Sequence, residues 1–94
     1  MTDHLVSREA TGSRGRYVTK RNGDEAELTF SVSTPTLVVA IHTGVPDSFR
    51  GAGVAMVAQL VADARAEGFK IVPQCPFVNA QRLRHPEWAD AFSA

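Results

Sequence analysis

The most regular pattern in the chain is an alternation of apolar and polar residues between positions 25 and 33. Ala26, Leu28, Phe30 and Val32 are separated by residues that carry a charge or a hydroxyl group. Successive side chains of a β-strand point to opposite faces of the sheet. The alternation therefore predicts a strand with one face on a core and the other face in water.

Further extended segments are predicted on both sides of this strand. Residues 16–20 are rich in β-formers, and the Asn-Gly pair at 22–23 tolerates the positive φ angles of a tight hairpin turn. Pro35 ends the alternating strand, and residues 36–43 are apolar on both faces, which favours a central position in the sheet. Residues 1–13 follow no period, so we expect a flexible tail or an edge strand there.

The hydrophobic period changes after position 46, where apolar residues recur at helical spacing. These residues are Val54, Val57, Leu60, Val61 and Ala64. The stripe predicts a helix that ends at Gly68, a residue typical of helix C-caps. Residues 69–72 form a short apolar strand, so the order strand, helix, strand predicts a right-handed crossover between two roughly parallel strands. Residues 77–92 predict one short helix and a second helix that begins at Pro86.

These elements predict one α/β domain over residues 1–94, more narrowly an α+β fold. It has a mixed sheet in which antiparallel N-terminal strands precede a strand-helix-strand crossover and a C-terminal helix. A hydrophobic content of 44% and a charged content of 21% are ordinary for a folded domain of 94 residues. Ten basic and ten acidic residues cancel, which argues against a nucleic-acid-binding protein.

The same composition gives expectations about compartment and assembly. The longest apolar run, residues 37–41, is much shorter than the about 20 residues of a membrane helix, so we expect a soluble protein without a membrane partner. The chain has one cysteine and opens without a signal sequence, which favours a cytoplasmic location. We expect a monomer or a weak homodimer.

The loop at residues 50–55, Arg-Gly-Ala-Gly-Val-Ala, lies between the apolar strand and the long helix. Backbone N–H groups gather at a helix N-terminus, where the partial positive charge favours an anion. Gly51 and Gly53 lack a Cβ and let an anion approach the backbone, and Arg50 can add a charged hydrogen bond. Neither the P-loop pattern nor the dinucleotide fingerprint is present. Taken alone, the loop is either a diphosphate site or a plain Gly-rich turn.

Four segments in register resemble a compact branch of single-domain GNAT-like acetyltransferases. They are HTGVP at 42–46, RGAGVA at 50–55, VPQCPFV at 72–78 and RHPEW at 84–88. The resemblance covers roughly residues 16–88 and implies that the loop holds the diphosphate of acetyl-coenzyme A (acetyl-CoA). It also implies that the backbone after the central strand binds the pantetheine arm in the manner of an added strand. The coenzyme-binding residues expected on this basis are Thr43, Gly44, Val45, Arg50, Gly51, Ala52, Gly53, Val54, Ala55 and Asn79.

The resemblance implies transfer of the acetyl group to an unidentified amine, either a small molecule or a protein amine. Direct attack on the thioester needs a base, an oxyanion donor and an acid for the departing thiolate. The chain departs from the compact branch at Gly44, where an acidic residue is frequent, and at Gln81, where a tyrosine is expected. A non-catalytic acyl-CoA-binding or protein-interaction module with the same fold therefore stays open as an alternative.

Two residues are candidates for catalysis. Cys75 follows the strand beside the expected thioester cleft and is a candidate nucleophile that accepts the acetyl group; its alternative role is a small, partly buried apolar residue. His42 ends the central strand and is a candidate base, with structural packing as its alternative. The three histidines show no metal-binding spacing, so no metal site is expected.

Overall fold

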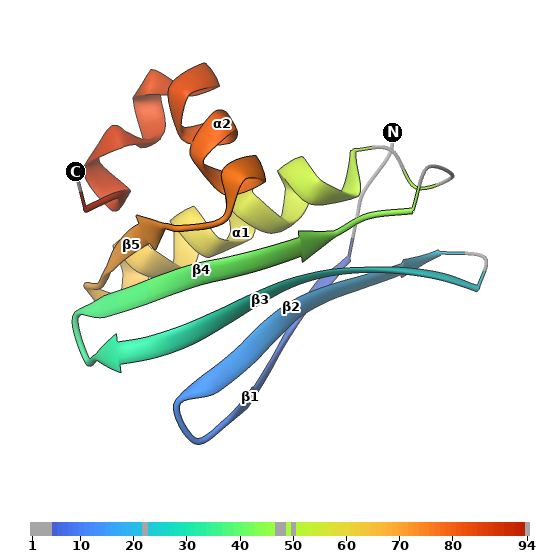
Figure 1. The fold of residues 1–94 in the computed structure, drawn as a ribbon, viewed down its shortest axis with the longest axis horizontal. Helices are drawn as coiled ribbons and strands as arrows, with labels where there is room; N and C mark the ends of the chain where they lie inside the picture. Colours follow the sequence, from blue (N-terminus) through green and yellow to red (C-terminus); the bar gives the residue numbers. More distant parts are fainter. Residues whose placement is uncertain (1–4, 22, 47–48, 50, 94) are drawn as a thin grey trace.

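The computed structural model describes residues 5–21, 23–46, 49 and 51–93. The strands are β1 (Val6–Thr11), β2 (Arg14–Arg21), β3 (Asp24–Thr34), β4 (Leu37–Gly44) and β5 (Lys70–Pro73). The helices are α1 (Ala52–Glu67), α2 (Pro76–Arg84) and the 3-10 helix η1 (Pro86–Ala91). The strands form one sheet in the order β1-β2-β3-β4-β5, in which only the pair of β4 and β5 is parallel (Figure 1). The predicted fold class is confirmed.

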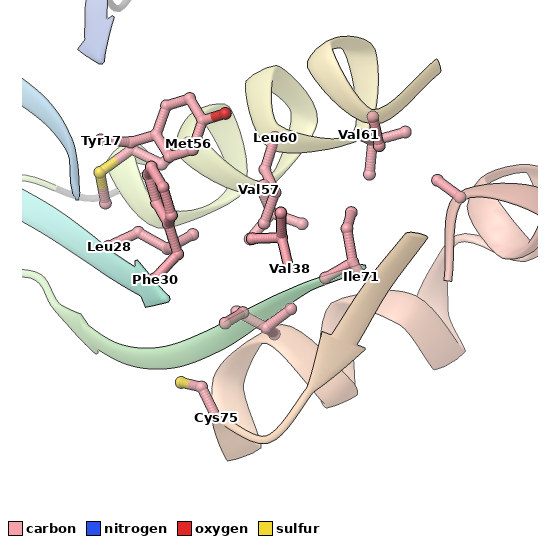
Figure 2. Packing of buried hydrophobic residues seen from close by; sticks show 14 of the residues in the cluster. Tyr17, Leu28, Phe30, Val38, Met56, Val57, Leu60, Val61, Ile71 and Cys75 are labelled. Atoms are coloured by element: carbon pink, nitrogen blue, oxygen red, sulfur yellow. The ribbon is translucent and has the colours of Figure 1, made fainter. Parts of the chain in front are cut away.

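The core lies between α1 and one face of the sheet. Met56, Val57 and Leu60 of α1 are fully buried against side chains from β2, β3, β4 and β5 (Figure 2). Four residues of the predicted helical stripe, Val57, Leu60, Val61 and Ala64, are on the buried face of α1, whereas Val54 is 36% exposed and the prediction is wrong there. Gly68 ends this helix with φ of 79°, a left-handed conformation that glycine adopts without strain, and its N–H donates to the carbonyl of Ala64.

The β2–β3 hairpin follows the predicted alternation over most of its length. Ala26, Leu28 and Phe30 are buried, and Gly23 in the turn has φ of 86°. The turn residue Asn22 lies outside the described residues. Val32 was expected on the core face but is 36% exposed, because it lines a pocket beside the end of α1 instead of packing beneath the helix. A register shift between Val32 and Thr34 also interrupts the pairing there.

The remaining elements agree with the predictions apart from their boundaries. Of the two expectations for residues 1–13, the edge strand is the one observed, over β1. β4 lies between β3 and β5, in the interior of the sheet as predicted. The second C-terminal helix begins at Pro86 but is a 3-10 helix, and a short 3-10 turn is common as a connector. After it, Phe92 forms a bridge with Ile71 at the free edge of β5.

Candidate functional site

The two parallel strands β4 and β5 stop pairing at the carboxyl end of β5. Their pairing runs from Leu37 with Lys70 to Ala40 with Pro73. The next contact is a hydrogen bond of 2.9 Å from the N–H of Cys75 to the carbonyl of Ala40. Beyond this point, residues 42–44 of β4 pair with β3 on one side, and no described strand pairs with the other side of residues 41–44. This opening leaves backbone groups of β4 available to an extended ligand.

A β-bulge in β4 determines whether each side chain beside the opening points to the α1 face of the sheet or to the opposite face. Phe30 pairs with Ala40 and Thr29 pairs with His42, so Ile41 is an extra residue in β4. Thr43 pairs with the buried residue Leu28 and therefore points to the α1 face. His42 points to the opposite face, and its side chain is exposed. The strand end that was expected to supply one catalytic residue thus presents side chains to both faces.

Cys75 lies on the α1 face of this opening, where it is the N-cap residue of α2. It is 4% exposed, and its Sγ lies 3.3 Å from Oγ1 of Thr43. Its carbonyl accepts a hydrogen bond of 3.0 Å from the N–H of Asn79. Figure 2 shows Cys75 where β5 passes into α2, with its sulfur directed away from the helix. The structure brings Cys75 together with Thr43, and the two candidates Cys75 and His42 lie on opposite faces of the sheet.

The N-terminus of α1 presents backbone N–H groups that no described side chain caps. Gly51 is the N-cap residue with φ of 87°, and no side-chain hydrogen bond to the cap is formed among the described residues. The carbonyl of Gly51 accepts from the N–H of Ala55, as the first helical turn requires. The first turn contains no acidic residue, so its partial positive charge is free to attract an anion. Arg50, expected to add a positive charge here, lies outside the described residues.

Gly53 has a structural role that differs from the one expected. It is buried, and a Cβ at this position would lie 2.6 Å from Cζ of Phe77 and 3.3 Å from Cγ2 of Val45. The space beside Gly53 is therefore filled by the first turn of α2 and by the residue that follows β4. The missing Cβ at Gly53 therefore makes room for Phe77, and anion binding at Gly53 stays a prediction. The exposed Gly51 needs glycine for its positive φ angle.

The chain also matches a known protein family over most of its length. A family model described as GCN5-related N-acetyl-transferase matches residues 16–91. The chain belongs to this family. Among curated proteins, no sequence matches the chain at a significant level. Membership of the GNAT family supports an acyltransferase in general, and proteins of this family generally use acetyl-CoA.

Asn79 is oriented by its own helix in this GNAT domain. Its Oδ1 accepts hydrogen bonds from Nε and Nη2 of Arg82, at 3.0 and 2.9 Å. The amide oxygen is therefore occupied, and the Nδ2 group remains to donate to a carbonyl of a ligand. Gln81 is also on α2 and is 4% exposed, but an amide does not titrate and cannot supply a proton to a thiolate. Position 81 therefore does not supply the proton that the tyrosine expected there could donate.

The face of the GNAT sheet opposite α1 carries charged residues that the sequence analysis did not select. Glu27 pairs with Gly44 across the sheet, which brings a carboxylate beside the end of β4. Arg16 is bonded to Glu9, Glu25 and Glu27 at 3.0 to 3.1 Å, and the hydrogen bond to Glu27 is the main cause of its raised pKa. The charge alternation in β3 was visible in the sequence, but only the pairing of β3 with β4 places Glu27 next to the opening.

Two absences concern the described residues alone. No group of three or more His, Cys, Asp or Glu side chains there is arranged to hold a metal ion. No helix of the described chain has both the length and the hydrophobicity to cross a membrane.

Proposed function

We propose that this protein is an N-acetyltransferase that binds acetyl-CoA in the opening between β4 and β5 and transfers the acetyl group to an amine. The observation that carries the proposal is the unpaired edge of residues 41–44 beside the uncapped N-terminus of α1. An extended arm can pair with the first, and a diphosphate can bind at the second. Family membership supports this combination.

Each part of the coenzyme has a proposed partner. Backbone groups at Thr43, Gly44 and Val45 bind the pantetheine arm. The N–H groups of Gly51, Gly53 and Val54 hold the diphosphate, with Arg50 as an additional positive charge, because those of Ala52 and Ala55 are bonded to the carbonyls of Phe49 and Gly51. Asn79 donates from Nδ2 to an amide carbonyl of the arm, since its Oδ1 is already bonded to Arg82.

The proposed chemistry begins at Cys75, because its sulfur is beside the opening and is in contact with the Thr43 hydroxyl. The Cys75 thiol gives up its proton to solvent or to a nearby base and its sulfur attacks the thioester carbonyl. The bond from carbon to the sulfur of coenzyme A breaks, the coenzyme A thiolate leaves and takes up a proton from solvent, and the acetyl group becomes attached to Sγ. An amine then attacks the acetyl-cysteine, and the Cys75 thiolate is released while the amine loses a proton to solvent or to a nearby base. We propose His42 as such a base for an amine that approaches from the face of the sheet opposite Cys75, where the exposed His42 side chain lies.

Binding, turnover and covalent chemistry are tested separately. At an acetyl-CoA concentration of 100 times its Kd, the free energy of unfolding should rise by about 2.7 kcal/mol. Turnover is then measured on a panel of small amines and a lysine peptide. Intact-mass spectrometry should show an acetyl adduct that is absent in Cys75→Ala and becomes resistant to hydroxylamine in Cys75→Ser, where an ester replaces the thioester. A wild-type protein that turns over without any adduct would exclude the cysteine route and leave direct attack.

A second candidate function is supported by Gly44 and Gln81, which replace two groups that could act as base and acid. In this case the domain binds acyl-CoA and acts as a non-catalytic or protein-interaction module. Stabilisation by acetyl-CoA without turnover on any amine of the panel would favour this second function over the first.

A further inference from the structure

A separate pocket lies on the α1 face of the sheet, at the end of α1 remote from the coenzyme loop. Its volume is about 230 Å³. Its floor consists of core side chains, among them Phe30, Leu60 and Phe69, and its open side is lined by Ala10 and Val32. The pocket exists because α1 ends at Glu67, so that the β1–β2 hairpin extends past the helix without a covering element (Figure 1).

The rim of this pocket is polar and held in place by β1, β2 and α1. Nη1 of Arg8 lies 2.8 Å from Oε2 of Glu67 and 3.3 Å from Oδ2 of Asp63. The hydroxyl of Tyr17 donates to the same oxygen of Asp63 at 2.6 Å. Burial is the main cause of the raised pKa of Tyr17, so this phenol remains protonated and remains a donor at neutral pH.

The rim has an excess of negative charge. Glu67 and Arg8 both line the pocket, and Asp63, which is not a lining residue, adds a second carboxylate 3.3 Å from Nη1 of Arg8, so the cluster carries one net negative charge. An anionic head group would be repelled there, whereas a cationic one would be attracted. The Glu67 side chain is 45% exposed and can turn toward a ligand at the mouth of the pocket.

We propose that this pocket binds a small primary amine with an apolar body. The body lies on Phe30, Leu60 and Phe69, and the ammonium group lies at the mouth beside Glu67. At about 30 Å³ for each non-hydrogen atom, the share that water takes in the liquid, the pocket holds about eight such atoms. This is smaller than the about 300 Å³ at which pockets for drug-sized ligands begin, so the ligand is a single ring or a short branched chain with one amine. The site does not depend on the proposed acetyl transfer.

The direct test is a titration of the full chain, labelled with ¹⁵N and free of acetyl-CoA, with three probes of one shape. Benzylamine is cationic, benzyl alcohol is neutral, and benzoate is anionic. We expect benzylamine to bind with a Kd on the order of 1–10 mM, as a ligand of this size allows, and to shift the amide signals of Ala10, Val32 and Phe69. Benzyl alcohol should bind about threefold more weakly, because it cannot form the exposed charge pair that the ammonium group forms with Glu67. Benzoate should not bind measurably.

Variants assign the binding to this pocket. Ala10→Leu fills the open side at an exposed position and should weaken benzylamine at least tenfold. Ser7→Leu is its control, because Ser7 lies on the same strand and faces the other side of the sheet. Val32→Phe, also at the open side, repeats the test if Ala10→Leu does not fold. Glu67→Gln should abolish the preference for the amine over the alcohol while leaving binding of the alcohol unchanged.

Several outcomes would overturn the proposal. Equal binding of the three probes would show that the rim does not select a cation. Unchanged binding to Ala10→Leu and Val32→Phe, or signals that shift only at residues 51–55, would place the amine elsewhere. The absence of any shift with benzylamine at 50 times the upper Kd would show that the pocket binds no such ligand. None of these results would affect the acetyl-CoA measurements, because the titration contains no coenzyme.

Discussion

The contact between Gly53 and Phe77 gives the sharpest prediction about the coenzyme loop. In Gly53→Ala, the new Cβ would lie 2.6 Å from Cζ and 2.9 Å from Cε2 of Phe77. Carbon atoms that are not bonded prefer a separation of about 3.5–4.0 Å, so the ring must retreat by about 1 Å. The Cβ would also lie 3.3 Å from Cγ2 of Val45, which limits the movement of α1 away from α2.

The magnitude follows from two opposing effects. Adding a methyl group to a packed contact costs about 1–3 kcal/mol. Alanine in place of a helical glycine recovers up to about 1 kcal/mol, and Gly53 has no positive φ angle that would cancel this gain. We therefore expect Gly53→Ala to lower the free energy of unfolding by about 1 kcal/mol. In a Phe77→Leu background the clash is removed, and the same substitution should be neutral or stabilising.

The assay is a double-mutant cycle measured by urea denaturation of the wild type, both single variants and the double variant. The expected coupling free energy is about 1–2 kcal/mol, within the range found for residues in contact. Gly44→Ala is the matched control and should change stability little, because a Cβ there would meet no atom closer than 3.6 Å. Acetyl-CoA binding is measured on the same four proteins. Zero coupling, together with loss of binding in both backgrounds, would refute the packing role and restore the role in anion approach.

Three further predictions concern the site and the fold. Gly44→Glu has room for a side chain beside His42 and should raise turnover about tenfold or more if a base is missing there, while Gly44→Gln should not. The pKa of Asp90 is lowered mainly by its hydrogen bond to Arg65, so this pair stabilises the fold above pH 3.8 and the contribution is lost as the pH falls through the lower folded pKa. Asp90→Asn should therefore flatten the fall of Tm below pH 3.8. Gly68→Ala forces a left-handed conformation on alanine and should cost about 1–2 kcal/mol in urea denaturation.

Most of the fold could be predicted because its elements are coded locally. The alternation of Ala26, Leu28 and Phe30 identifies the core face of β3, since one period decides both the strand and its buried side. Gly68 ends α1 where the helical stripe ends, since a C-cap needs a residue that tolerates positive φ. Val32 is an exception. Its exposure depends on the residue at which α1 ends, and the sequence of β3 does not contain that information.

The site was predictable only in part, because its geometry depends on pairing between distant segments. The bulge at Ile41 directs Thr43 toward α1 and His42 to the other face, and an unbroken register with β3 would have reversed both assignments. Phe49 lies in the loop before α1 and is 2% exposed, yet a single aromatic residue among turn residues gives no period to detect. The sequence patterns indicate which residues are near the opening, whereas the pairing with β3 decides which way they point.

The contact between α1 and α2 joins two parts of the proposed site that are far apart in the sequence. Phe77 follows Cys75 by two residues, and its ring packs against Gly53 in the first turn of α1. This contact therefore links the position of the Cys75 sulfur to the position of the N–H groups proposed for the diphosphate. A shift of α2 that relieves a larger side chain at position 53 would also move Sγ relative to Thr43, which lies 3.3 Å away. Gly53→Ala should thus slow formation of the acetyl adduct at Cys75 more than it weakens acetyl-CoA binding, and Phe77→Leu should reduce that difference.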